Sequence, residues 1–198
     1  MKKAILILLI ACIAVAGCGK AVKRVGIEEI IDLSGKWNDT DSRLVSEAMI
    51  SDALSRPWLS KFKEDRTGKQ PVVIVGTVRN LSHEHINVMA FVKDLERELI
   101  NSGQVEFVAA KGEREELREE RKEQAQYASE ETAKAFGEEA GADYMLKGTI
   151  NTILDKAEGK EVMFYQVNLE LMDLQSSKKV WIGEKKIKKL ISRSRVSP

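Results

Sequence analysis

PVVIVGTV, at residues 71–78, is the stretch from which the fold of this chain can be worked out. It is a nearly continuous run of β-branched side chains. Such a run is typical of a strand that is buried on both faces. We therefore predict a central strand here, with the neighbouring segments packed beside it or over it.

The segment after this strand reads as a helix followed by a second strand. Asn87 can cap the helix, and Gly103 stands where left-handed chain termination is common. The apolar side chains at helical spacing are Phe91, Val92, Leu95, Leu99 and Ile100. Residues 105–109 then predict a short strand. A strand, helix and strand of these lengths indicate a right-handed parallel crossover.

The segment before the strand predicts another helix. Residues 43–54 carry apolar side chains close to helical spacing, and Thr40 or Asp41 is the expected N-cap. Pro57 should end this helix, because its ring disfavours helical geometry in the residue before it. A further helical turn is expected up to Phe62, followed by a loop. Residues 27–33 alternate loosely and predict an edge strand.

The last third of the chain changes from helical to strand periodicity. A charged helix over residues 113–126 and a helix capped by Ser129 come first. Apolar and polar side chains then alternate in segments that begin near Tyr144, Tyr165 and Val180, which is typical of antiparallel strands. The loop 175–178 should join the last two. The predicted fold class is therefore α/β, a mixed sheet flanked by helices in a single domain over residues 30–192.

The first eighteen residues have the order of an export signal. Lys2 and Lys3 precede an apolar run that is too short for a confident membrane span, and small residues follow it. Val15-Ala16-Gly17-Cys18 resembles the bacterial lipobox. This resemblance implies a signal peptide at 1–17, acylation of Cys18, and a tether over 18–29. Gly19, in place of an aspartate, implies the periplasmic face of the outer membrane. The alternative is a secreted protein whose leader happens to end in cysteine.

Composition restricts the possible functions. The chain has 32 Lys and Arg against 31 Asp and Glu, so a strongly basic nucleic-acid binder is not expected. The only cysteine besides Cys18 is Cys12, inside the leader. A mature chain would therefore have no disulfide and no thiolate nucleophile.

Candidate catalytic and metal-binding residues are sparse. His83 and His85 could share a metal ion, but a zinc site needs further protein ligands, and we interpret them as solvated loop residues. Ser34 and Ser82 do not lie in the turn that a serine nucleophile uses. Thr67–Gln70 lacks the glycine and the hydroxyl of a phosphate loop. We therefore predict no catalytic residue, metal or cofactor, and a protein that is not an enzyme.

Several stretches in the same order resemble the LpoB-type penicillin-binding protein activator lipoproteins. They are DLSGKWNDTDS (32–42), VIVGTVRN (73–80), FVKDLERELINSG (91–103), REELREE (114–120), GADYMLKG (141–148) and YQVNLELMDL (165–174) with Val180-Trp181. The resemblance implies a fold like the TolB amino-terminal domain and the CsgG-like proteins. It also implies outer-membrane anchoring and docking on a class A penicillin-binding protein to stimulate peptidoglycan polymerisation. Trp37 would then pack beside the capped helix as scaffold.

Two polar regions are the predicted partner contacts, since binding surfaces favour exposed segments on a rigid scaffold. They are the loop that contains Arg79, Asn80 and His83, and the charged helix with Glu113, Arg114, Arg118 and Arg121. A second function remains open, because CsgG secretion-channel proteins are also lipidated: an accessory lipoprotein of a secretion or envelope-assembly complex. A pore former would need added hairpins with strands of about 9–11 residues, and none is evident.

Overall fold

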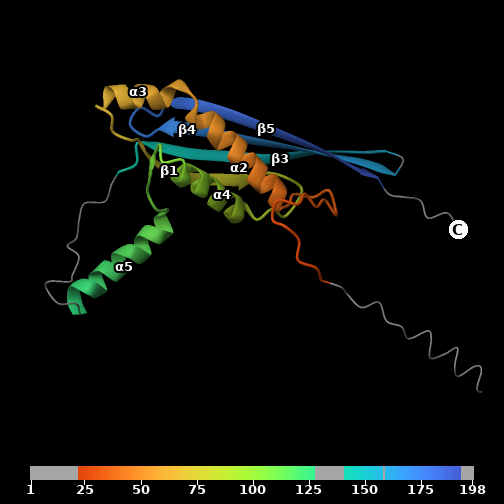
Figure 1. The fold of residues 1–198 in the computed structure, drawn as a ribbon, viewed down its shortest axis with the longest axis horizontal. Coiled ribbons are helices and arrows are strands. Elements are labelled where there is room, and N and C mark those ends of the chain that lie inside the picture. Colours follow the sequence, from red (N-terminus) through yellow and green to blue (C-terminus); the bar gives the residue numbers. More distant parts are fainter. Residues whose placement is uncertain (1–21, 128–140, 158, 193–198) are drawn as a thin grey trace, which may run out of the picture. The chain divides into compact units, whose positions relative to one another are not determined.

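The computed structural model describes residues 22–127, 141–157 and 159–192. The leader, Cys18 and the helix predicted after Ser129 lie outside them. Residues 22–30 contain no helix or strand, and the described residues from Ile31 onward belong to one compact unit. Its elements in chain order are α2 (Asp39–Leu54), α3 (Pro57–Asp65), β1 (Val72–Asn80), α4 (Val88–Asn101), β2 (Glu106–Phe107), α5 (Lys111–Tyr127), β3 (Tyr144–Ala157), β4 (Lys160–Asp173) and β5 (Lys179–Ser192) (Figure 1).

The five strands form one mixed sheet in the order β2-β1-β3-β4-β5. β1 pairs in parallel with both β2 and β3, whereas β3, β4 and β5 pair antiparallel. The predicted α/β class, the mixed sheet and the parallel β1–α4–β2 connection are therefore confirmed. β2 is shorter than predicted and contains only Glu106 and Phe107.

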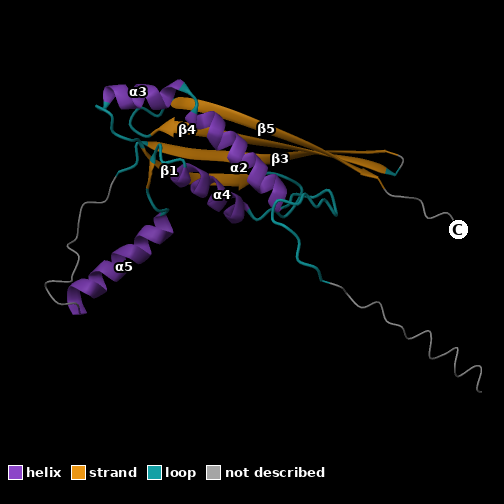
Figure 2. Ribbon diagram, viewed as in Figure 1, coloured by secondary structure: helices purple, strands orange, loops and turns teal. Residues whose placement is uncertain are grey.

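The sequence predicted that β1 would be buried on both faces, but only one of its faces is buried. Val73, Val75 and Val78 are buried, whereas Val72 and Ile74 are partly exposed. The reason is that α2 and α4 contact the sheet on the face that carries the buried valines, and the other face is left partly open. Figure 2 shows the two helices crossing the strands. β-branched side chains also suit a half-buried strand, so the run did not distinguish the two cases.

The hydrophobic core lies between this sheet face and the two helices. α4 contributes Phe91, Val92, Leu95 and Leu99, all buried as predicted. Ile100 was predicted to join them, but half of its surface is exposed. It follows Leu99 directly and so points about 100° away around the helix. The strands contribute alternate residues, which are Tyr144, Leu146, Ile150, Met163, Tyr165, Val167, Leu169, Leu171 and Trp181.

The start of α2 differs from the prediction by two or three residues. Its N-cap is Asn38, not Thr40 or Asp41, and the helix begins at Asp39. The Asn38 side chain accepts a hydrogen bond from the Asp41 N–H at 3.1 Å, and Asp41 accepts one from the Asn38 N–H at 3.0 Å. This reciprocal pair is a capping box, in which the side chain of the third helical residue accepts a hydrogen bond from the N-cap backbone. Asp41 therefore contributes to the cap from inside the helix.

Two other local predictions have opposite outcomes. The edge strand predicted over residues 27–33 is wrong, since these residues form turns and irregular chain. Pro57 behaves as predicted: α2 ends at Leu54, and Pro57 opens α3 at its first position. Proline is favoured there because its missing N–H would have no partner in the helix.

The antiparallel part of the sheet consists of three strands of 14 residues each. The predicted loop at 175–178 joins β4 to β5. In it Asp173 accepts hydrogen bonds from the N–H groups of Gln175, at 2.9 Å, and Ser176, at 2.7 Å. β5 lies at the edge of the sheet and carries the lysine-rich run Lys185–Lys189. Lysines on an edge strand discourage pairing with another chain.

Candidate functional site

The sheet face away from α2 and α4 is a candidate contact surface. Strand alternation places one set of side chains on it, and all of them are partly or fully exposed. Its apolar members are Ile74, Met145, Ile153, Phe164, Met172, Ile182 and Leu190, and its polar members include Arg79, Lys147, Thr149, Asn168, Glu170, Lys186 and Lys188. Apolar side chains and charged side chains of both signs thus share one face, and Glu184 pairs with Lys186 on it at 2.6 Å.

Arg79, a predicted contact residue, lies on this open face. It borders a shallow hollow of about 480 Å³ together with Thr77, Lys147, Asn168 and Glu170. Gly148 forms part of the hollow as well, and a Cβ at this position would collide with the carbonyl oxygen of Asn168 on β4. The glycine therefore allows β3 to approach β4 closely beside the hollow.

Asn80 and His83 were also predicted as contacts, but their side chains are engaged in shaping the loop after β1. Asn80 Oδ1 accepts hydrogen bonds from the N–H and hydroxyl of Ser82, at 2.9 and 2.6 Å, and its Nδ2 donates to the Glu84 carbonyl at 2.7 Å. His83 Nδ1 lies 2.9 Å from the Thr152 hydroxyl. The rings of His83 and His85 are exposed, as predicted.

Glu84, between the two histidines, has a structural role that the sequence did not indicate. Its carboxylate accepts hydrogen bonds from the Tyr165 hydroxyl, at 2.9 Å, and the Trp37 N–H, at 3.1 Å. The Trp37 ring packs edge-to-face on Tyr165 and Phe91, with centroids 5.6 and 5.9 Å apart. Burial, and then the bond to Glu84, raise the pKa of the Tyr165 hydroxyl. Trp37 is thus part of the scaffold, as predicted.

Lys189 binds the polar stretch before α2 to the edge of the sheet. Its ammonium lies 2.6 Å from the carboxylates of both Asp32 and Asp41, and the Lys189 and Asp41 side chains are only 9% and 8% exposed. Burial alone would lower the pKa of Lys189, but the bonds to the two carboxylates raise it. Burial raises the pKa of Asp41 despite the bond from Lys189. The run DLSGKWNDTDS therefore serves to fasten β5 to the start of α2.

The predicted contacts on α5 lie elsewhere. Arg79 pairs with Thr149 near the end of β1, whereas α5 follows β2, which pairs with the first residues of β1. Six residues of strand separate the two positions, a distance of roughly 20 Å. The structure therefore does not bring the loop and helix predictions into one site.

Within α5, the predicted residues have different surroundings. Glu113 Oε1 lies 2.6 Å from the Lys93 ammonium on α4, and its Oε2 accepts a 2.9 Å hydrogen bond from the Ala110 N–H. Both bonds lower the pKa of Glu113, and the bond from Lys93 has the larger effect. Arg114 and Arg121 are partly buried, whereas Arg118 is exposed. Glu113 thus joins α5 to α4, and Arg118 is the most accessible of the four.

In the part of the chain that the structure describes, no three His, Cys, Asp or Glu side chains are grouped closely enough to bind a metal ion. None of the helices described there is long and apolar enough to span a bilayer.

Together these features define a small α/β domain with helices on one face of a mixed sheet and a mixed apolar and charged surface on the other. The chain belongs to the LpoB family of peptidoglycan-synthase activators, whose family model matches residues 41–187. The match begins at Asp41, so most of the 32–42 stretch lies outside it. No curated protein matches the chain.

Solved structures with similar folds include two crystallised domains and one solution structure of this family. The LpoB C-terminal domain from Salmonella enterica is 16% identical, with a TM-score of 0.44, and the match covers 74% of this chain and 98% of that one. The corresponding Escherichia coli domain is 17% identical, with a TM-score of 0.41 and coverage of 72% and 97%. The NMR structure of E. coli LpoB is 16% identical, with a TM-score of 0.42 and coverage of 90% and 84%. Family membership rests on the sequence model, since these structural scores are low.

Proposed function

We propose that this protein is an envelope lipoprotein that activates a class A penicillin-binding protein in peptidoglycan synthesis. The observation that carries the proposal is the match of residues 41–187 to the synthase-activator family. Such an activator acts by binding, so it needs a stable scaffold and an accessible surface but no catalytic groups of its own.

The anchor we propose is an acyl group on Cys18, with signal peptide 1–17 removed and the protein held on the periplasmic face of the outer membrane. The support is the order of charged, apolar and small residues before Cys18. Twelve residues from Gly19 to Ile30 reach at most about 40 Å when extended. The folded domain would therefore stay near the membrane surface, and an inner-membrane synthase would have to extend toward it.

The docking surface we propose is the open sheet face around Arg79. Arg79 and Lys147 border its hollow, and Lys186 and Lys188 add positive charge on β5. This surface favours a partner region with exposed acidic and apolar side chains. Arg118, on α5, is a second candidate contact. Asn80, His83 and Glu113 are better explained as residues that shape the loop and hold α5.

A reconstitution experiment tests the activator role. The full-length chain in mild detergent would be added to purified class A penicillin-binding proteins, and glycan polymerisation from labelled lipid II would be followed. We expect a several-fold rate increase with one of them. Arg79→Glu should reduce this increase at least tenfold, because it reverses the charge beside the hollow. The matched control is Lys69→Glu, in an exposed loop.

Two results would contradict the proposal. If no synthase is bound or stimulated, and a secretion component is recovered from solubilised envelope instead, the protein is an accessory of that other complex. If cells grown with labelled palmitate leave the protein unlabelled, or label Cys18→Ser equally, the anchor is wrong.

A further inference from the structure

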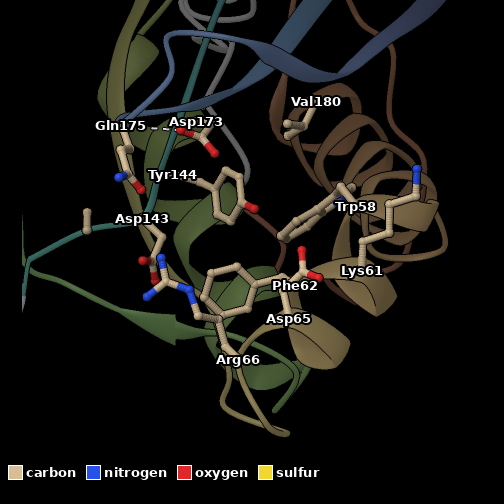
Figure 3. A pocket seen from close by; sticks show the side chains of 11 residues that line it. Trp58, Lys61, Phe62, Asp65, Arg66, Asp143, Tyr144, Asp173, Gln175 and Val180 are labelled. Carbon is tan, nitrogen blue, oxygen red and sulfur yellow. Dashed lines mark hydrogen bonds between the residues drawn. The ribbon is translucent and has the colours of Figure 1, made fainter.

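A pocket of about 290 Å³ lies at the end of the sheet opposite the loop after β1, between α3, the start of β3 and the β4–β5 turn. Its lining combines aromatic rings with carboxylates from separate elements. The residues used below are Trp58, Phe62, Asp65, Asp143, Tyr144 and Asp173 (Figure 3). None of them is a predicted contact or part of the open sheet face, so the pocket has no role in the docking proposed above.

The aromatic wall of the pocket is fixed by its own packing. The Tyr144 ring lies edge-to-face against Trp58, with centroids 5.0 Å apart, and against Phe62, at 5.7 Å. The Trp58 indole N–H donates a 2.6 Å hydrogen bond to the Ala53 carbonyl at the end of α2. A ligand would therefore meet a preformed surface, and little ordering of side chains would oppose its binding.

Tyr144 carries an unused polar group at this wall. The residue is only 7% exposed, and its hydroxyl makes no hydrogen bond to another residue in the described part of the chain. Figure 3 shows the hydroxyl pointing into the hollow between Trp58 and Phe62. The hydroxyl is therefore available as a hydrogen-bond donor or acceptor to a group that enters the pocket.

The charge around the hydroxyl is negative. Asp65, Asp143 and Asp173 outnumber the cations Lys61 and Arg66 in the lining. Burial, then Asp173 and Asp143, raise the pKa of Tyr144, so the phenol remains neutral. The pKa of Asp173 is lowered, chiefly by the hydrogen bond from the backbone N–H of Ser176, so this carboxylate stays ionised.

The carboxylates keep free acceptor capacity. Asp143 uses Oδ2 to accept from the Val72 N–H at 2.8 Å, and Asp173 uses Oδ1 for the turn. The other oxygen of Asp143, and both oxygens of Asp65, accept no hydrogen bond within the described residues. An occupant with several donors and a positive charge would satisfy them.

We propose that this pocket receives an arginine side chain from a protein partner. A guanidinium is planar and always charged. It stacks on aromatic rings and offers five N–H donors, which suit Asp65, Asp173 and the Tyr144 oxygen. The chain itself shows this chemistry, because the Arg66 guanidinium carbon lies 5.7 Å from the centroid of the Phe62 ring. The volume is at the lower limit for small-molecule sites and suits a single side chain.

The direct test uses N-acetyl-arginine methylamide as the probe and its citrulline analogue as the neutral isostere. The ¹⁵N-labelled full-length chain in detergent would be titrated with each and followed by NMR. We expect saturable shifts at Tyr144, Val180 and the α3 backbone with a millimolar Kd, and binding of the citrulline compound at least fivefold weaker. Equal shifts with both probes, shifts confined to other regions, or none at 50 mM would overturn the proposal.

Variants distinguish binding of arginine in this pocket from non-specific electrostatic attraction of a cation to the protein. Asp65→Asn and Tyr144→Phe should each weaken arginine binding at least threefold, and both should leave the rest of the NMR spectrum unchanged. Asp155→Asn, on an exposed part of β3, removes the same charge away from the pocket and should have no effect. If Asp155→Asn weakens binding as much as Asp65→Asn does, the pocket is not the binding site.

The identity of the partner rests on the proposed function. An experiment with the synthase can therefore test the pocket inference and the proposed function separately. Asp65→Arg should reduce synthase binding at least tenfold, whereas Asp155→Arg should not. If both variants bind and activate a synthase like the unmodified chain, the pocket inference fails and the proposed function stands. If no synthase binds the unmodified chain, the proposed function fails, and the arginine titration still decides the pocket.

Discussion

The Lys189 ammonium and the Asp41 carboxylate lie 2.6 Å apart, although 148 residues separate them in the chain. Asp41 also belongs to the capping box of α2, so one carboxylate supports both the helix start and the edge strand. The other end of α2 is joined to β5 as well, because the Trp181 indole N–H donates a 2.8 Å hydrogen bond to Asp52. Polar contacts therefore hold α2 to β5 at both ends of the helix.

Removing the Lys189 ammonium should destabilise the domain strongly. Lys189→Met leaves the buried Asp41 carboxylate without its cation, and breaking a buried pair in this way costs about 3 kcal/mol. Lys186→Met, on the same strand but 52% exposed, should change the free energy of unfolding by less than about 0.5 kcal/mol. Urea denaturation of both variants measures the difference. Equal effects would show that the Lys189 pair does not stabilise the fold.

The two buried tyrosines offer a matched comparison. Tyr165→Phe deprives the Glu84 carboxylate of a donor and should cost about 1–3 kcal/mol, because that acceptor is partly buried. Tyr144→Phe removes a hydroxyl with no partner among the described residues, so its effect should stay within about 0.5 kcal/mol. Thermal or urea unfolding compares them. A larger loss for Tyr144→Phe would contradict the hydrogen bonding described here.

Stability should fall at alkaline pH. The pKa values of Tyr165, Tyr144 and Lys189 are all raised in the folded protein. As the pH rises, the unfolded chain therefore loses these protons before the folded protein does. The stabilisation that the three groups give below pH ~10 then disappears as the pH rises above this value. Each group adds a slope of up to about 1.4 kcal/mol per pH unit. Tyr165→Phe should show a shallower decline between pH 9 and 11, and an unchanged slope would refute this origin.

Gly148 should tolerate no side chain. In Gly148→Ala the new Cβ meets the Asn168 carbonyl, a backbone atom of the paired strand that cannot rotate away. We expect a loss of about 1–3 kcal/mol, as for other overpacked sites. Gly112→Ala places its Cβ in open space near the start of α5 and should be neutral or stabilising by up to about 1 kcal/mol. Similar denaturation midpoints for the two variants would contradict the close approach of β3 and β4.

The sequence by itself determined which segments are helices and strands over most of the described chain. Alternation predicted the antiparallel strands, and helical spacing predicted α2 and α4, because periodicity reports which face of an element is buried. Neighbouring charges of opposite sign predicted α5. The same reasoning failed for β1, where β-branched side chains fit a half-buried strand as well as a fully buried one. It also failed for residues 27–33, where weak alternation was not supported by a neighbouring strand.

Only the tertiary structure decided which polar side chains meet. Glu84 and Tyr165 are 81 residues apart, Lys189 and Asp32 are 157 apart, and the pocket draws its lining from α3, β3 and the β4–β5 turn. A hydrogen bond requires its two atoms to come within about 3 Å, and sequence periodicity carries no such distance. Among the predicted contacts, the fold leaves Arg79 at an open hollow and uses Asn80, His83 and Glu113 to hold the scaffold together.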